Sequence, residues 1–333
     1  GGSRLDMPDM DIAALTLDAR RLWPGEALWD GPLCFVDLDT TGDAPDEPLL
    51  PPCPVVGLGD PAHPFARHLD AVIEPPVGAA GLAKQVLAKP LAAAVIVQLL
   101  RVLPSLSCDE GLTAESFAYG LLQGSDEHRQ WIAGRQQGEQ LARTPGEVWL
   151  AREGERLIVT LDHPDSGNAI DRHMRDQLYE AFTLANIDLE IRRVSLRGAG
   201  RTFSLGAELG EFGTTSDPAT AHAIRFLTLP ARALARVADK LDVHVQGGCA
   251  GAGLELAAYA VRFTAAPDAW FQLPELAMGI LPGAGGCVSL TRRIGRQRAA
   301  LMMLSGKRIS AQRALGWGLI DAIAGDESGA DIG

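Results

Sequence analysis

The sequence has little of what marks several large classes of protein. Aromatic residues make up only 5% of it, and its 30 Lys and Arg residues are outnumbered by 42 Asp and Glu residues. The net charge of −12 argues against nucleic acid or an anionic membrane as the main partner, because both repel a negative surface. We also expect no membrane span, since the chain has no run of about 18 apolar residues and the stretch 91–103 is interrupted by Gln98 and Arg101.

Motifs for metal binding and for disulfide bonding are also missing. The chain contains no HxH or HExxH motif and no cluster of carboxylates, so we predict no metal ion. Its cysteines are odd in number, scattered and free of any CxxC pair, which is typical of reduced, structural thiols and predicts a cytoplasmic protein. The five cysteines are Cys34, Cys53, Cys108, Cys249 and Cys287.

The length and the apolar content predict a globular protein with a sizeable core. The chain has 333 residues, of which 47% are hydrophobic, enough for one large domain or two ordinary ones. Strands and helices alternate in its second part, which predicts an α/β layered fold. Thr144-Pro145-Gly146 breaks the chain and marks our domain boundary. We therefore divide the chain into an N-terminal arm (1–30), a small α/β plus helical region (31–145) and an α/β core (146–333).

Local patterns predict the elements of the N-terminal half. A weak helix is expected over 12–22, ended by Pro24-Gly25. Short apolar runs between loops rich in Pro, Asp and Gly predict strands, and longer helical patterns follow them. Strands are expected at 33–38, 55–58 and 71–73, and helices at 79–88, 90–103, 113–122 and 126–141.

A glycine-dense stretch between a predicted strand and a predicted helix is the first candidate for chemistry. The apolar run 241–245 predicts a buried strand, a turn rich in glycine follows, and 254–259 predicts a helix. Backbone N–H groups at such a junction are unpaired and point outward, and small residues let a ligand oxygen approach them. Glu255 lies just inside this helix, and a carboxylate beside an anion-binding turn suggests acid–base work on a carbonyl compound. The alternative is a tight turn that packs a helix on a sheet, with Glu255 in solvent.

Several other residues are of types that often bind ligands or catalyse reactions, but they are expected to be structural here. Gly248, Gly251 and Gly253 lack the G-x-G-x-x-G spacing, which disfavours a dinucleotide-binding turn. None of the seven histidines is supported by a motif, and aromatic residues next to apolar runs are typical of a core. The residues expected to be structural are His163, His244, Trp270 and Phe271.

Four segments of the second part occur in the order found in one enzyme superfamily. They are 163–170 (HPDSGNAI), 201–209 (RTFSLGAEL), 245–256 (VQGGCAGAGLEL) and 271–286 (FQLPELAMGILPGAGG). Over roughly residues 146–325 the sequence resembles the crotonase (enoyl-CoA hydratase/isomerase) superfamily. The resemblance implies a core built as a spiral of ββα repeats, to which the mainly helical N-terminal region is an addition. It also implies acyl-CoA thioesters as ligands and assembly as a homotrimer or homohexamer.

By position, the resemblance assigns four residues to the chemistry. The backbone N–H groups of Ala207 and Ala252 would form the oxyanion hole, which stabilises the enolate that thioester chemistry creates. Glu255 and Glu275 would be the two glutamates of a hydratase, one to deprotonate water and one to supply the α proton. Many relatives with other activities keep only one such glutamate or neither, so the presence of both favours hydration. Alanine at 252 is a mild departure, since the family often has glycine there.

Two of the four segments also match the region that takes coenzyme A in the family. Asp165 is a departure, because close relatives often have Lys or Arg there and an aspartate repels the phosphates. We consider Arg201, Arg172 or a neighbouring subunit as the compensating cation, or a ligand other than ordinary CoA. Glutamate at 208 replaces the commoner aspartate. The predicted CoA contacts are Ser166, Gly167, Ala169, Leu205, Glu208 and Leu209.

The two ends of the sequence depart from the family pattern. Crotonases continue past the strand that matches 319–323 with several helices, which close the acyl pocket and build the trimer. Residues 70–135 resemble that tail, in the segments 70–76, 89–101 and 111–127. We therefore hypothesise that the helical cap has been displaced to the N-terminal side. The alternative is that helical segments rich in Ala and Leu simply look alike.

The resemblance leads to one predicted function and two alternatives. We predict a lyase of fatty acid metabolism that hydrates 2-enoyl-CoA thioesters through an enolate, with the CoA thioester as substrate and no metal or redox cofactor. The first alternative is an enoyl-CoA isomerase or an acyl-CoA hydrolase with the same oxyanion hole, since a fold does not fix a reaction. The second is a non-catalytic crotonase-fold binding or scaffold protein, which Asp165 and the unusual N-terminal region motivate.

Overall fold

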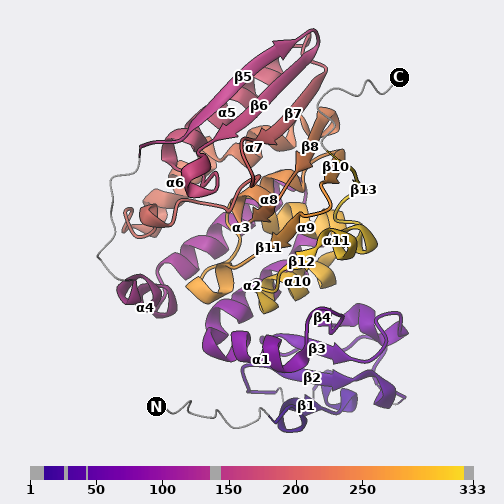
Figure 1. Ribbon diagram of the computed structural model, residues 1–333. Helices are drawn as coiled ribbons and strands as arrows, with labels where there is room; N and C mark the ends of the chain where they lie inside the picture. Colours follow the sequence, from indigo (N-terminus) through magenta and orange to yellow (C-terminus); the bar gives the residue numbers. More distant parts are fainter. Residues whose placement is uncertain (1–10, 26–28, 43, 136–143, 326–333) are drawn as a thin grey trace, which may run out of the picture.

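Three sheets organise the described part of the chain, with helices packed around them (Figure 1). The computed structural model describes residues 11–25, 29–42, 44–135 and 144–325. A six-stranded sheet lies at one end of the molecule and a four-stranded sheet of N-terminal residues lies at the other. A three-stranded sheet lies between them, and it carries the turns that position the candidate site.

The six-stranded sheet starts with a hairpin. β5 (Glu147–Glu153) and β6 (Arg156–Asp162) pair antiparallel, and every later neighbour in the order β13-β10-β8-β7-β6-β5 is parallel. Buried and half-buried residues alternate along β6, as expected for a strand with one face on the core. The helix α5 (Arg172–Ile187) is capped by Asp171, whose side chain accepts the N–H of Met174. The other strands are β7 (Arg193–Gly198), β8 (Leu241–Val245), β10 (Arg262–Ala265) and β13 (Ala322–Ile323).

The three-stranded sheet alternates with helices that pack on one another. β9 (Gly248–Ala250) pairs parallel with β11 (Trp270–Gln272), which pairs antiparallel with β12 (Ile309–Ser310). The helix α9 lies between α8 and α10 and contacts both. This alternation of strands and helices confirms the predicted α/β core. The helices of the core after α5 are α6 (Pro218–Thr228), α7 (Pro230–Ala235), α8 (Ala252–Ala257), α9 (Gly286–Ile294), α10 (Arg296–Ser305) and α11 (Ala311–Trp317).

The N-terminal sheet is parallel throughout, and it corrects one prediction. The helix predicted over 12–22 is wrong: two 3₁₀ turns, η1 (Ala13–Leu15) and η2 (Ala19–Leu22), flank the short strand β1 (Thr16–Leu17). Pairing of β1 with β2 and burial of Leu17 outweigh a weak local preference for helix. The predicted strands are confirmed as β2 (Cys34–Asp37), β3 (Val55–Leu58) and β4 (Ala71–Val72).

Four helices connect the N-terminal sheet to the core. α3 begins at Cys108 rather than at 113, because the Ser107 side chain accepts the N–H of Glu110 and caps the helix there. The helix predicted over 126–141 ends at Gly134, and positions 136–143 lie outside the described residues. No single described helix is long and apolar enough to cross a membrane. The segments 79–88 and 90–105 would be long and apolar enough if joined, but they are bent by 108° relative to each other. The four helices are α1 (Ala79–Ala88), α2 (Pro90–Val102), α3 (Cys108–Gln123) and α4 (Asp126–Gly134).

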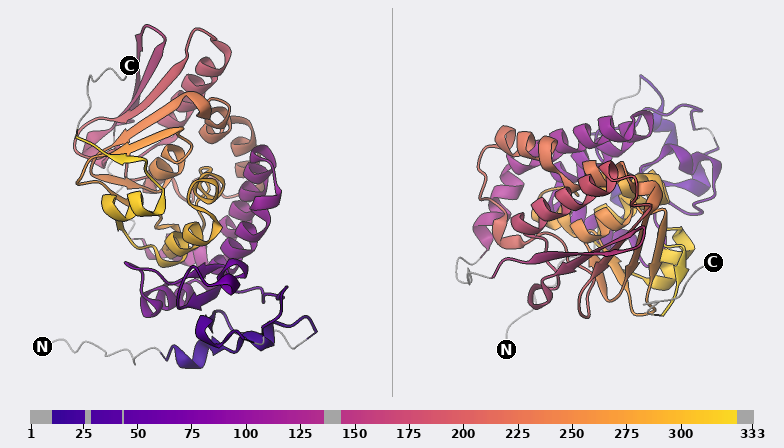
Figure 2. Two further views of the ribbon diagram at one scale, coloured as in Figure 1. Left: turned by 90° about the vertical axis from the view of Figure 1, so that its right-hand side faces the viewer. Right: turned by 90° about the horizontal axis from the view of Figure 1, so that it is seen from above.

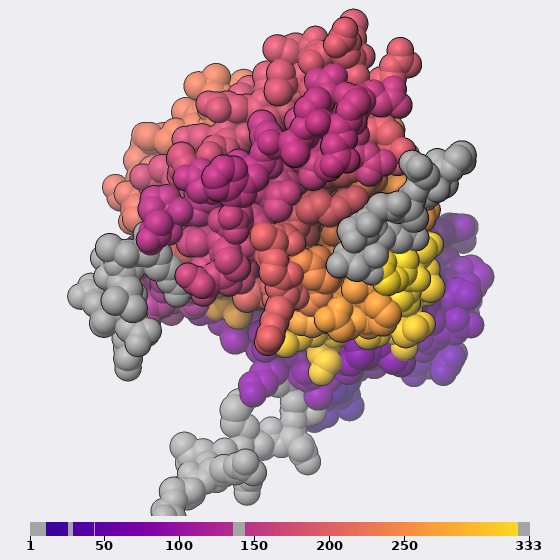
Figure 3. All heavy atoms as spheres, turned by 45° about the horizontal axis from the view of Figure 1, so that its top comes forward, coloured from indigo at the N-terminus to yellow at the C-terminus, as the bar shows by residue number. Residues whose placement is uncertain are grey.

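These helices pack directly on the core. α1 and α2 contact α10, and α3 contacts both α6 and α9. Figure 2 shows them along one side of the core, and Figure 3 shows N-terminal residues beside the C-terminal elements. One cluster of buried apolar side chains runs across the boundary placed at 144–146, from Leu33 and Phe35 to Leu319 and Ile320. The displaced-cap hypothesis requires such packing, and the origin of the helices stays a prediction.

Candidate active site

The glycine-dense stretch forms a turn with a conformation that only glycine adopts easily. After β8 and β9, Gly251 takes φ 52° and ψ −133° at the start of α8. A Cβ atom added there would lie 3.3 Å from the Glu275 Oε1 atom and 3.3 Å from the Gly206 Cα atom. The positive φ and the close packing together explain why glycine stands at this position. The helix itself begins at Ala252, earlier than the predicted start at 254.

The turn brings together the two segments that carry the predicted oxyanion hole. Ile170 donates to the Gly206 carbonyl at 2.8 Å and accepts from the Glu208 N–H at 3.0 Å. These two bonds bracket Ala207 and do not use its own N–H. Ala252 is the first residue of α8, so its N–H has no partner inside the helix. A Cβ atom added to Gly206 would lie 3.5 Å from the Ala252 nitrogen, which places the two donor segments in contact.

Glu255 is buried under the loop that leads into α9. Its side chain is 2% exposed, and its Oε1 atom accepts the N–H groups of Ala284 at 2.9 Å and Gly286 at 3.0 Å. A Cβ atom added to Gly286 would lie 2.2 Å from the Glu255 Cγ atom, so this loop needs glycine to approach the carboxylate. Burial raises the pKa of Glu255 to about 7, although the two N–H groups oppose the rise. Both bonds go to Oε1, so Oε2 is the oxygen available to a water molecule.

Glu275 opens the 3₁₀ turn η9 (Glu275–Met278) and faces the same site. It is 8% exposed, and its Oε2 atom is buried with no hydrogen-bond partner among the described residues. Burial, and next the charge of Glu255, raise the pKa of Glu275 well above its usual range. Two buried carboxyl groups that interact in this way do not both ionise readily, so the pair retains a proton near neutral pH. One of the two can then donate a proton while the other accepts one.

The residues predicted to bind coenzyme A lie in neighbouring loops. The N–H of Leu205 donates to the Gly167 carbonyl at 2.9 Å, and the Leu205 side chain covers that glycine. The Ser166 hydroxyl accepts the N–H of Ala169 at 3.2 Å, which fixes the first loop. Ala169 is buried, whereas Leu205 and Leu209 are each 44% exposed. The two leucines therefore offer apolar surface to a ligand on this face.

The charged residues around these loops differ in their availability. The Glu208 side chain caps the short turn that follows it by accepting a backbone N–H. Asp165 is exposed, as is Arg201. Arg172 is also exposed, but its guanidinium donates to the Thr214 hydroxyl at 3.1 Å. Arg201 is thus the exposed cation that best matches the predicted compensation for Asp165.

The residues expected to be structural follow that expectation with one exception. Phe271 is fully buried, and the rings of His163 and His244 each form a hydrogen bond inside the protein. Trp270 is only partly buried, and the guanidinium of Arg308 lies 3.8 Å from its ring centroid. The prediction of Trp270 as a core residue is therefore wrong in part, because successive residues of β11 point to opposite faces and Phe271 takes the buried one.

Sequence reasoning missed two residues of α3 that reach the same site. Glu115 is fully buried and accepts the N–H groups of Gly285 and Cys287, both at 2.8 Å. Tyr119, one turn later, packs against Gly283, where an added Cβ atom would lie 2.2 Å from its ring. The signal for Glu115 was an acidic residue on the face of the helix that packs on the core. Nothing in the local sequence identified the loop that it contacts.

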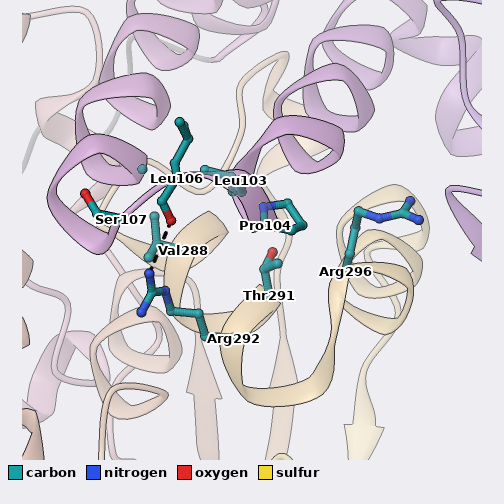
Figure 4. A pocket seen from close by; sticks show the side chains of 9 residues that line it. Leu103, Pro104, Leu106, Ser107, Val288, Thr291, Arg292 and Arg296 are labelled. Atoms are coloured by element: carbon teal, nitrogen blue, oxygen red, sulfur yellow. Dashed lines mark hydrogen bonds between the residues drawn. The ribbon is translucent and has the colours of Figure 1, made fainter.

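A separate pocket lies between the connection from α2 to α3 (103–107) and α9 (Figure 4). It has a volume of about 260 Å³ and contains none of the predicted site residues. The guanidinium of Arg292 crosses it to reach the Leu106 carbonyl at 3.5 Å. This pocket is therefore distinct from the predicted site. It is lined by Leu103, Pro104, Leu106, Ser107, Gly111, Val288, Thr291, Arg292 and Arg296.

Known proteins resemble the core of this chain in sequence and in structure. The model of the Enoyl-CoA hydratase/isomerase family matches residues 153–329. The 2,3-dehydroadipyl-CoA hydratase of Escherichia coli K12 is 36% identical over 177 residues, covering 53% of this chain and 69% of that protein. The 1,2-epoxyphenylacetyl-CoA isomerase of the same strain is 34% identical, covering 53% and 68%.

A solved structure shows that the likeness extends to the fold. The crystal structure of an enoyl-CoA hydratase/isomerase from Marinobacter aquaeolei superposes with a TM-score of 0.50 at 27% identity. The match covers 54% of this chain and 71% of that one. The predicted crotonase-like fold of the core is thereby confirmed. The family model begins at 153, so it does not include the helices α1 to α4.

Proposed function

The chain belongs to the enoyl-CoA hydratase/isomerase family, and we propose that it hydrates 2-enoyl-CoA thioesters. The observation that carries the proposal is the pair of buried glutamates, Glu255 and Glu275, beside the backbone N–H groups of Ala207 and Ala252. Hydration needs a base, an acid and a stabiliser of negative charge on the thioester oxygen, and these four groups supply all three. The raised pKa values of both glutamates suit proton transfer near neutral pH.

The proposed reaction divides the two proton transfers between the glutamates. The N–H groups of Ala207 and Ala252 donate to the thioester oxygen as the enolate forms. Glu255, with its free Oε2 atom, takes a proton from water while the water oxygen bonds to the β carbon. Glu275, which is protonated, gives its proton to the α carbon, and the double bond between the two carbons becomes a single bond. The product is a 3-hydroxyacyl-CoA, and no redox step is required.

The position of the acyl-CoA and the assembly are further parts of the proposal. We place the pantetheine along Ser166, Gly167 and Ala169, with the half-exposed Leu205 and Leu209 beside it. Arg201 is the proposed partner of a CoA phosphate near Asp165. A homotrimer or homohexamer remains our expectation for the assembly.

Double-bond isomerisation is the second candidate. The observation that favours it is the Glu275 Oε2 atom, which is buried without a hydrogen-bond partner in the described part of the chain and could carry a proton between two carbons of the acyl chain. In this reaction water would not be consumed, so Glu255 would have no water to activate.

Loss of the conjugated thioester absorbance of crotonyl-CoA tests the proposed function. We expect the protein to bleach this absorbance and the variants Glu255→Gln and Glu275→Gln to be slower by at least about a hundredfold each, the typical contribution of a general acid or base. Glu127→Gln is a suitable control, because it changes a glutamate that contacts α2 and not the site. The absence of bleaching with every 2-enoyl-CoA tried would refute the hydratase proposal.

A further inference from the structure

Two glutamates from opposite halves of the chain bind one loop. Residues 284–287 present four consecutive N–H groups at the start of α9. Glu255 accepts the first and the third, from Ala284 and Gly286, and Glu115 accepts the second and the fourth, from Gly285 and Cys287. The donor–acceptor distances are all 2.8–3.0 Å. The carboxylates therefore alternate along the loop, and neither can shift without moving the donors of the other.

The loop has no room to adjust around these carboxylates. Gly286 lies against the Glu255 side chain, and an added Cβ atom on Gly285 would lie 2.9 Å from the Tyr259 hydroxyl oxygen. That hydroxyl donates to the Gly285 carbonyl at 2.7 Å. The hydroxyl of Ser289 donates to the Glu255 carbonyl at 2.7 Å. The position of the Glu255 carboxylate thus depends on the position of this loop.

Glu115 itself is fully buried on α3. Burial, and next the charge of Glu255, raise its pKa well above the usual range, while the backbone N–H groups lower it. A buried carboxyl group is costly unless its hydrogen bonds offset the loss of water, and here two short bonds at the start of a helix do so. An apolar residue at this position would be buried at a lower cost in free energy. The presence of a glutamate therefore indicates a role beyond packing α3.

We propose that Glu115 is a positioning residue for Glu255, acting through the loop 284–287. This inference rests on the proposed function and adds that the N-terminal half supplies part of the catalytic geometry. Glu115 fixes two of the four donors, and the other two then hold the Glu255 Oε1 atom so that Oε2 faces the water to be activated. Glu115 touches neither substrate nor water in this arrangement.

The variant Glu115→Gln tests the proposal, because its amide keeps the size but presents a donor to one of the two N–H groups. We expect amide hydrogen exchange across 284–287 to accelerate by about tenfold or more, as expected when a buried N–H group loses its hydrogen-bond acceptor. On crotonyl-CoA we expect kcat to fall by about tenfold or more, while KM stays within about threefold. Loss of a residue that only stabilises the fold would accelerate exchange throughout the core rather than selectively at this loop, and would leave kcat at full occupancy unchanged.

Glu127 provides the matched control. Its carboxylate also accepts two backbone N–H groups at the start of a helix, from Leu91 at 3.0 Å and Ala92 at 2.8 Å of α2. Glu127→Gln should accelerate exchange at Leu91 and Ala92 and leave both the loop 284–287 and kcat unchanged. If Glu115→Gln does not fold, Glu115→Asp replaces it, since its shorter side chain cannot reach both donors and should give the same pattern to a smaller degree.

The two readouts separate this inference from the proposed function. Exchange at 284–287 that matches the wild type, or a kcat no lower than that of Glu127→Gln, overturns the positioning of Glu255 by Glu115. A wild-type protein without activity on any enoyl-CoA overturns the proposed function instead. In that case the exchange measurement alone still decides whether Glu115 fixes the loop.

Discussion

As the pH is lowered, the activity of this protein is expected to fall at a higher pH than it would if its general base were an ordinary, solvated glutamate. Burial raises the pKa of Glu255 from 4.5 to about 7, even though Ala284 and Gly286 donate to its Oε1 atom. A base must be ionised to accept a proton, so activity is present above pH 7 and declines as the pH falls through 7. At pH 5 about 1% of such a carboxyl group is ionised, compared with about three quarters of a group with a pKa of 4.5. We therefore expect kcat/KM at pH 5 to be about a hundredfold lower than at pH 8.

Initial rates with crotonyl-CoA from pH 5 to pH 9, at constant ionic strength, measure this dependence. Returning each sample to pH 8 before a second assay shows that the protein has not unfolded, which is the necessary control. A kcat/KM that stays level down to pH 5.5 would mean that Glu255 titrates as a solvated glutamate, and the reasoning from burial would be refuted.

Three further predictions concern stability. Gly251→Ala should lower the free energy of unfolding in urea by about 1–3 kcal/mol, because of the positive φ and the 3.3 Å contacts. Gly134→Ala, whose added Cβ atom meets no described residue within 4 Å, should not. Between pH 4.5 and 7 the native state keeps the Glu255 proton and the unfolded state releases it. As the pH rises through that range, the free energy of unfolding of the wild type should therefore fall by about 3 kcal/mol relative to that of Glu255→Gln. Parallel curves of the free energy of unfolding against pH would contradict this. Asp70→Asn should cost about 3 kcal/mol or more, because it leaves Arg101 without its buried partner at 2.7 Å, whereas Asp18→Asn, in an exposed pair, should have little effect.

The parts of the site that lie close in sequence could be predicted from the sequence. Strand, glycine turn and helix follow one another within 241–257, so the local pattern indicated Glu255 and a turn with unpaired backbone N–H groups. The assignment of Ala252 within that turn came from the resemblance to a family. The hairpin of β5 and β6 and the cap Asp171 have equally local signals. Ala207 and Glu275 required the resemblance to a family, because only the fold brings their segments to the turn.

The parts that depend on distant contacts could not be predicted. Glu115 and Gly285 are 170 positions apart, and no spacing rule connects them. The strand β1 forms because β2 pairs with it, although the residues of 12–22 prefer a helix weakly. Trp270 is an aromatic residue next to an apolar run, which is typical of a core, but it lies on the partly exposed face of β11 beside Arg308. In each case the deciding interaction is tertiary.

The most direct test of hydration is the mass of the product formed from trans-2-hexenoyl-CoA in D₂O. The proposed mechanism predicts a 3-hydroxyacyl-CoA heavier by one water molecule, with one non-exchangeable deuterium on the α carbon delivered by Glu275. A product that has gained no water would indicate isomerisation, and free CoA would indicate thioester hydrolysis. Either result, or unchanged substrate, would contradict the account of Glu255 and Glu275 as the base and the acid of a hydratase.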